Sequence, residues 1–109
     1  MFQVHFSHPF GRATLAVEGE LTIFSATEAH ALMKEILAGA ELPDIDLSAI
    51  SELDTAGAQL LVWMKQEAHA ANKPLAYVHH SPAVVEALDL LNLTAVLGDP
   101  ILMAPSGRE

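Results

Sequence analysis

Asp46-Leu47-Ser48-Ala49-Ile50-Ser51-Glu52-Leu53-Asp54-Thr55-Ala56-Gly57 is the stretch that decides how this chain folds and what it does. The apolar run 45–47 predicts the end of a buried strand, and the helix-period run 59–71 predicts a long helix. Thr55 therefore lies where a helix should begin. A helix N-terminus has N–H groups without partners and a partial positive charge, so it favours capping oxygens and anions. The Thr55 hydroxyl is either a cap or a place that can carry a phosphate.

The residues beside Thr55 have structural interpretations of their own. Either Thr55 is the N-cap, or Asp54 is the cap and Thr55 is the first helical residue. Asp54 could also act as a general base toward the hydroxyl, but capping is the preferred interpretation. Gly57 lies one turn into the helix, where glycine costs about 1 kcal/mol relative to alanine. A close approach by the sheet or by a partner would explain it, and we expect the sheet.

The pattern of apolar residues predicts five strands. They are expected over 4–7, 13–18, 45–47, 75–78 and, as an edge strand, 101–103. His8-Pro9-Phe10-Gly11 is expected to form a turn, Gly19-Glu20 to interrupt the second strand, and the run 21–24 to continue apolar.

Three helices are expected, over 27–38, within 59–71, and from Ser81 to near Asn92. Ser25 or Thr27 would cap the first helix and Gly39 would end it, while Asn72-Lys73-Pro74 would end the second. Ser81 before Pro82 has the preferred order of N-cap and first helical residue. The predicted inward faces are Ala29, Leu32, Met33, Ile36 and Leu37, then Leu60, Leu61, Met64, Ala68 and Ala71, then Val84, Val85, Leu88 and Leu91.

This order of elements predicts an α/β fold, a mixed sheet of four to five strands with three to four helices packed on it. With 109 residues the chain is expected to form one domain, with 104–109 as a loose tail. No segment reaches the roughly 18 apolar residues of a membrane span, and the N-terminus lacks the basic start of a signal peptide, so a cytoplasmic protein is expected.

Composition excludes several kinds of chemistry. The chain has no cysteine, so it has no disulfide, thiolate metal site or cysteine nucleophile. A net charge of −9 disfavours nucleic-acid binding. The six histidines show no H-x-x-x-H or H-E-x-x-H spacing, and adjacent His79 and His80 would point to opposite faces of an extended chain. Without a nucleophile elbow or a glycine-rich phosphate loop, we expect no catalytic residues, no metal and no cofactor.

Three motifs in order resemble the STAS domain, which anti-sigma factor antagonists share with the cytoplasmic ends of sulphate transporters. The first is Gly19-Glu20-Leu21 after a strand. The second is Asp46-Leu47-Ser48 leading to Leu53-Asp54-Thr55-Ala56-Gly57 at the start of the second helix. The third is Ser81-Pro82-Ala83-Val84, with Leu91-Asn92-Leu93 closing that helix. The resemblance covers about residues 12–103 and implies a STAS-like fold.

For function, the resemblance implies a non-enzymatic signalling module that binds an anti-sigma factor or a serine/threonine switch kinase. In phosphoregulated members the hydroxyl directly after the aspartate is the phosphorylation site, which corresponds to Thr55. A kinase adds the phosphate, a phosphatase removes it, and the phosphorylated form releases its partner. Many antagonists have serine here. In the lipid-asymmetry transporter branch a threonine contacts the ATPase subunit, so an accessory subunit of such an ABC transporter, with Thr55 unmodified, is the alternative.

Partner contacts are expected around the hydroxyl and along the exposed side of the helix that follows it. Trp63, the only tryptophan, falls near Gln59 and Gln66 and off the apolar stripe. It is either a docking anchor or a side chain that packs under a neighbouring loop. The expected partner-binding residues are Ser51, Asp54, Thr55, Ala56, Gly57, Gln59 and Trp63.

Overall fold

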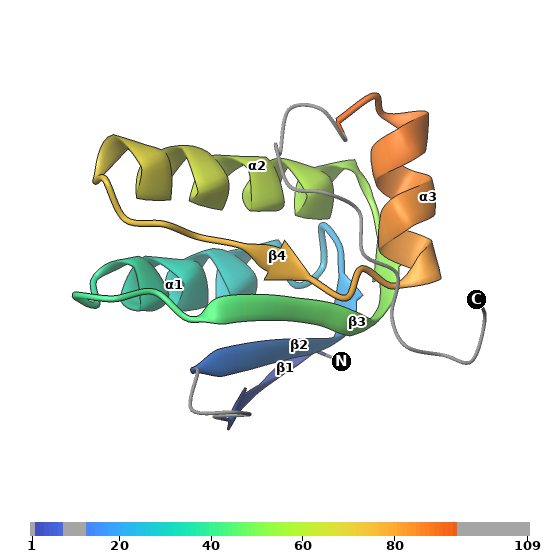
Figure 1. Cartoon of the computed structure of the whole chain (residues 1–109). Helices are drawn as coiled ribbons and strands as arrows, with labels where there is room; N and C mark the ends of the chain where they lie inside the picture. Colours follow the sequence, from blue (N-terminus) through green and yellow to red (C-terminus); the bar gives the residue numbers. More distant parts are fainter. Residues whose placement is uncertain (1, 8–12, 94–109) are drawn as a thin grey trace.

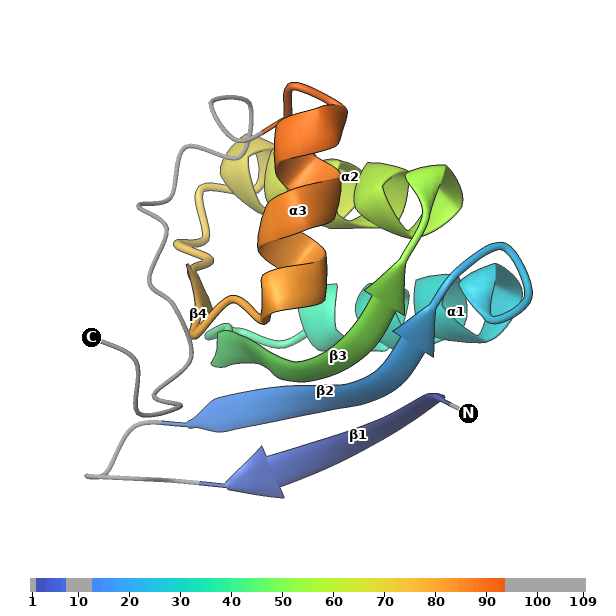
Figure 2. The same ribbon diagram turned by 90° about the vertical axis from the view of Figure 1, so that its right-hand side faces the viewer.

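The computed structural model describes residues 2–7 and 13–93. Seven elements follow one another along them: β1 (Phe2–Ser7), β2 (Thr14–Leu21), α1 (Ala26–Leu37), β3 (Asp44–Leu53), α2 (Thr55–Ala70), β4 (Tyr77–Val78) and α3 (Pro82–Leu90). The strands form one sheet in the order β1-β2-β3-β4. β1 is antiparallel to β2, whereas β2, β3 and β4 are parallel. The helices lie on the same side of β1, β2 and β3 (Figures 1 and 2), which confirms the predicted mixed sheet with helices packed on it.

The predicted turn 8–11, the edge strand 101–103 and the tail 104–109 lie outside the described residues. None of the helices within 2–7 and 13–93 is long and apolar enough to cross a membrane.

β3 is longer than predicted, because it continues past Leu47 to Leu53. Its inward residues are Ile45, Leu47, Ile50 and Leu53, so the later ones are three positions apart instead of two. The pairing with β2 shifts register twice, between Ala16 and Glu18 and again between Gly19 and Glu20. Each shift places an extra β3 residue opposite β2, as in a β-bulge. The bulges break the alternation of buried and exposed residues from which the end of this strand at Leu47 was predicted.

Two other strand predictions were wrong. β2 runs through Gly19 and Glu20 to Leu21 without interruption. Gly19 adopts φ 105°, which a residue with a side chain rarely adopts, so glycine lets the strand continue through this position. At the far edge of the sheet, only Tyr77 and Val78 of the predicted strand 75–78 pair with β3.

The core lies between the sheet and the helices. The predicted inward residues Ala29, Met33, Leu61, Met64, Ala68, Val84 and Leu88 are all buried, together with Leu15, Val17, Ile45 and Leu47 from the sheet. Leu60 is only half-buried, and Ala71 is exposed because α2 ends at Ala70. Leu60 still packs against the core, whereas Ala71 was wrongly placed on the buried stripe, because the helix ends one residue before it.

The helix ends follow the predicted capping chemistry in most cases. Ser81 caps α3 by accepting a hydrogen bond from the Val84 amide at 3.2 Å, and Pro82 is the first helical residue. Asn72 and Asn92 end α2 and α3 in the left-handed conformation, with φ 58° and 57°. Ser25 occupies the N-cap position of α1, but its hydroxyl does not cap that helix.

Candidate functional site

Asp54, and not Thr55, caps α2. The Asp54 carboxylate accepts a hydrogen bond from the Gly57 amide through Oδ1, at 2.9 Å. Its own backbone is extended, as expected of an N-cap, and Thr55 is the first helical residue. Of the two arrangements that the sequence allowed, the structure therefore has the one in which the threonine hydroxyl is not needed to begin the helix.

The second oxygen of the same carboxylate binds a distant part of the chain. Asp54 Oδ2 accepts a hydrogen bond from the Ile23 amide at 2.8 Å, across 31 positions of sequence. Hydrogen bonds to a charged acceptor are stronger than neutral ones. One carboxylate thus fixes both the start of α2 and the connection that leads from β2 to α1.

That connection, residues 22–25, is a tightly hydrogen-bonded turn. The Ser25 hydroxyl donates to the Glu20 carbonyl at 2.8 Å and accepts from the Thr22 amide at 3.1 Å. The Ser25 amide donates to the Thr22 carbonyl at 3.0 Å, and the Phe24 amide donates to the Thr22 hydroxyl at 3.3 Å. With Asp54 holding Ile23, the turn has a defined shape at the end of the sheet.

Gly57 is present because α2 begins in contact with the end of β2. A Cβ at this position would lie 2.1 Å from the Leu21 carbonyl oxygen and 2.8 Å from Leu53 Cδ1. A Cβ cannot lie 2.1 Å from a backbone oxygen, so only glycine fits this backbone. The expected close approach of the sheet is confirmed.

Thr55 is exposed, and among the described residues its hydroxyl has no hydrogen-bond partner. It stands at an open groove of about 460 Å³, whose walls come from α2 and from the residues that end α3. The groove is lined by Thr55, Gln59, Val62, Trp63, Gln66, Leu91 and Leu93. The structure therefore places three of the sequence-predicted site residues, Thr55, Gln59 and Trp63, along one depression.

The remaining predicted site residues differ in their exposure. Ser51 is exposed in β3, at the second register shift between β2 and β3, whereas Ala56 is half-buried and Gly57 is buried. Trp63 is half-buried against the core, and its ring stands 4.6 Å from the His30 ring of α1, centroid to centroid. The tryptophan thus contacts α1 on one side and lines the groove on the other.

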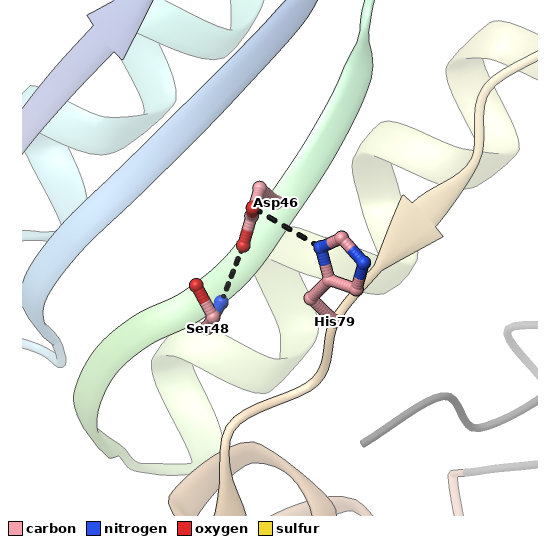
Figure 3. A network of polar contacts seen from close by, with 3 residues as sticks. All are labelled: Asp46, Ser48 and His79. Atoms are coloured by element: carbon pink, nitrogen blue, oxygen red, sulfur yellow. Dashed lines mark hydrogen bonds and ion pairs between the residues drawn. The ribbon is translucent and has the colours of Figure 1, made fainter. Parts of the chain in front are cut away.

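A second polar cluster lies on the other half of β3 (Figure 3). Asp46 Oδ1 accepts from the Ser48 amide at 2.8 Å, and Oδ2 lies 3.3 Å from His79 Nδ1. Burial by itself would raise the pKa of Asp46, but the hydrogen bonds from Ser48 and the neighbouring His79 together hold that pKa below its usual value. His79 reaches the carboxylate from a backbone with φ 55°. The cluster ties β3 to the segment that leads into α3.

The order of groups in this cluster does not suit catalysis. The aspartate lies between the serine and the histidine, whereas a serine nucleophile needs the histidine in the middle.

Elsewhere, Lys65 and Lys73 border a depression of about 520 Å³. Both amines donate to backbone carbonyls, of Leu75 and of Leu37 and Gly39 respectively. Within the part of the chain that the structure describes, no three His, Asp or Glu side chains gather as a metal site would require.

Sequence reasoning missed the apolar tip of the 22–25 turn. Ile23 is 63 % exposed and Phe24 is 97 % exposed, on the turn that Asp54 holds. The sequence offered no signal for this, because two apolar residues after a strand look the same whether they are buried or exposed. The link from Asp54 to Ile23 is likewise visible only in three dimensions.

The chain matches the family model described as Mlab, STAS domain, over residues 4–102. No curated protein sequence matches it. Several solved structures have the same fold at low identity. An anti-sigma factor antagonist from Mycobacterium paratuberculosis is 19% identical with a TM-score of 0.69, and 98% of this chain and 88% of that one are covered.

The anti-sigma factor antagonist SpoIIAA matches in two states. Its unphosphorylated form is 20% identical, with a TM-score of 0.65 over 97% of this chain and 90% of that chain. The phosphorylated form of the Bacillus protein is 19% identical, with a TM-score of 0.63 over 98% and 93%. At these identities the likeness concerns the fold, and the fold is similar to both states.

Proposed function

This chain belongs to the STAS-domain family, and from that membership we propose that it is a non-enzymatic regulatory module that binds a protein partner through the surface around Thr55. The partner would be an anti-sigma factor or a serine/threonine kinase of the switch type, and phosphorylation of Thr55 would set the affinity. The observation that carries the proposal is that two different residues at the start of α2 provide the helix cap and the exposed hydroxyl. Asp54 caps the helix, which leaves the exposed Thr55 hydroxyl available for modification.

Phosphorylation at this position would act without refolding the domain. A phosphate adds a charge of about −1.5 to −2 and three strong acceptors. The N-terminus of α2 tolerates it, because the helix dipole favours negative charge there. Asp54 and the exposed Glu52 stand beside it, so the surface becomes strongly negative. A partner that covers Thr55 closely would have to desolvate this charge, and it would therefore release the phosphorylated form.

The groove supplies the contact surface on this proposal. Gln59 and Trp63 follow Thr55 along its wall, and Ser51 is exposed in β3, shortly before α2. Ala56 and Gly57 lie behind the exposed threonine, where Gly57 sets how closely α2 approaches the sheet. We assign them the supporting role of positioning Thr55 for the partner.

A second candidate function is favoured by the description of the matching family model, which names Mlab. On this candidate the chain is an accessory subunit that binds the ATPase of a lipid-asymmetry ABC transporter. Thr55 would then contact the ATPase and would not be phosphorylated. The exposed threonine beside the groove serves this role equally well, so the two candidates differ in the partner and in the modification.

Affinity purification from the native cell, combined with mass spectrometry, separates the two. The proposal predicts a kinase-like or anti-sigma partner and a phosphate on Thr55 in part of the protein. Recovery of an ABC ATPase in stoichiometric amount with unmodified Thr55 would establish the second candidate instead. With the purified partner, Thr55→Glu should weaken binding while Thr55→Ala should not. Unchanged binding for both variants would remove Thr55 from the interface.

A further inference from the structure

The end of the sheet beside Thr55 presents an apolar knob, formed by Ile23 and Phe24. Phe24 is 97 % exposed and Ile23 is 63 % exposed, whereas the other large exposed apolar side chain among the described residues, Leu90, lies on α3. A single exposed leucine is ordinary on a protein surface. An exposed phenylalanine next to an exposed isoleucine is a feature typical of interaction sites.

Hydrogen bonds fix the backbone of the knob, which distinguishes it from the tip of a loop without such bonds. The amide of Ile23 is bound by Asp54, and the amide of Phe24 is bound by the Thr22 hydroxyl. Ser25 closes the turn through its hydroxyl and its amide. A side chain whose backbone is already fixed loses less entropy when it is buried by a partner. Aromatic residues in such positions are the usual anchors of interfaces.

The knob and Thr55 belong to one continuous surface. Asp54 Oδ2 binds Ile23 in the turn, and the next residue along the chain is Thr55. Any partner that covers Thr55 from the β2 side also meets the knob. Two exposed carboxylates lie close to these residues in sequence: Glu52 is two positions before Asp54, and Glu28, four positions after Phe24, is in the first turn of α1.

We propose that Phe24, supported by Ile23, is the apolar anchor of the partner interface, and that the partner presents an apolar pocket with a basic rim that receives it beside Thr55. The apolar pocket matches the side chains of the knob, and the basic rim matches Glu28 and Glu52. This inference rests on the proposed function, because it takes the partner to be a protein that covers Thr55. The partner must then carry this pocket and rim, and most of the affinity depends on Phe24.

The apolar pocket of the partner also explains how a phosphate on Thr55 would lead to release. An anchor that enters an apolar pocket brings the neighbouring residues into a surface from which water is excluded. A doubly charged group at that boundary must lose its hydration. The knob therefore makes the affinity sensitive to a modification that it does not itself carry.

The test compares Phe24→Ser with Leu90→Ser, a matched control on an exposed leucine of a different element. The probe is the purified protein partner, identified first by photo-crosslinking from position 24 in the native cell, and the dissociation constant is measured by calorimetry. Phe24→Ser should weaken binding at least tenfold and leave the circular dichroism spectrum and the melting temperature unchanged. Leu90→Ser should stay within twofold of the wild type. Weakening of less than twofold for Phe24→Ser would overturn the inference.

Two further measurements are the partner affinity of Thr55→Glu and the oligomeric state of the free protein by sedimentation analysis. If Thr55→Glu weakens binding and Phe24→Ser does not, the anchor is wrong while the proposed switch stands. If Phe24→Ser weakens binding and Thr55→Glu does not, the anchor stands while the switch is wrong. If the free protein is a dimer that Phe24→Ser converts to a monomer with unchanged partner affinity, the knob is a self-association site and the inference is overturned.

Discussion

Asp54 is the residue that joins the fold to the candidate site. Its two oxygens bind amides from the start of α2 and from the 22–25 turn, so its removal breaks two contacts at once. An N-cap contributes about 1 kcal/mol, and the second hydrogen bond contributes a similar amount at this partly exposed position. The stability of this part of the molecule therefore depends strongly on one carboxylate.

We expect Asp54→Ala to lower the free energy of unfolding by about 2 kcal/mol. Asp54→Asn should lose less, since its amide oxygen can still accept one of the two hydrogen bonds. Urea denaturation measures both, with Glu52→Ala as a control for an exposed carboxylate two positions earlier. A loss for Asp54→Ala no larger than that of the control would contradict the role of this residue.

Gly57→Ala tests the contact between α2 and the sheet. Helix propensity alone would make the alanine more stable by about 1 kcal/mol. The added Cβ, however, would meet the Leu21 carbonyl at 2.1 Å, and we expect a loss of about 3 kcal/mol. Gly39→Ala is the matched control, because the nearest atom to its Cβ is 3.4 Å away. Equal stability of the two variants would show that α2 does not approach the sheet this closely.

At the scale of the elements, long-range hydrogen bonds from one lysine connect the segment after α2 to the end of α1. Lys73, after the end of α2, donates to the carbonyls of Leu37 at 2.8 Å and Gly39 at 2.7 Å. Carbonyls at the end of a helix lack partners within that helix, and a cation there also complements the helix dipole. The Lys73 amine, from the turn that follows α2, thus caps the end of α1.

Lys73→Met should lower the free energy of unfolding by about 1 kcal/mol and should speed hydrogen exchange in the last turn of α1. Lys34→Met removes an exposed lysine from that same turn and is expected to stay within about 0.5 kcal/mol of the wild type. If exchange in the last turn of α1 is the same in both variants, the capping role of Lys73 is wrong.

The link between β3 and the segment before α3 depends on pH through Asp46. The pKa of Asp46 is lower in the folded protein than its ordinary value, so ionised Asp46 stabilises the fold at pH values above that ordinary value. This contribution is lost as the pH falls through the folded pKa. Relative to Asp46→Asn, the wild type should therefore lose its advantage in unfolding free energy below about pH 4. A difference between the two proteins that does not change from pH 7 to pH 3 would contradict this.

At the scale of the whole molecule, much of the fold was predictable because the deciding signals are local. Asn72 ends a helix and Ser81 begins one through bonds to nearby backbone, and local sequence carries such information. The mixed sheet follows from the order of the elements. The length of β3 was not predictable, since bulges against β2 change its period, and a bulge depends on the partner strand.

The candidate site was predictable only in part, for the same reason. The motif around Thr55 indicates the hydroxyl, and the spacing of Gln59 places it along the same helix. The second hydrogen bond of Asp54, to Ile23, and the exposure of Phe24 depend on how segments far apart in sequence are arranged. The apolar knob could therefore be recognised only once the fold was known.

The central claim is that the state of Thr55 sets the affinity for a protein partner. The most direct measurement is the dissociation constant of the purified partner for two samples of this protein, one unmodified and one fully phosphorylated at Thr55. We predict that the phosphate weakens binding at least tenfold while the circular dichroism spectrum stays the same. Equal dissociation constants for the two samples, or tighter binding of the phosphorylated one, would contradict the account.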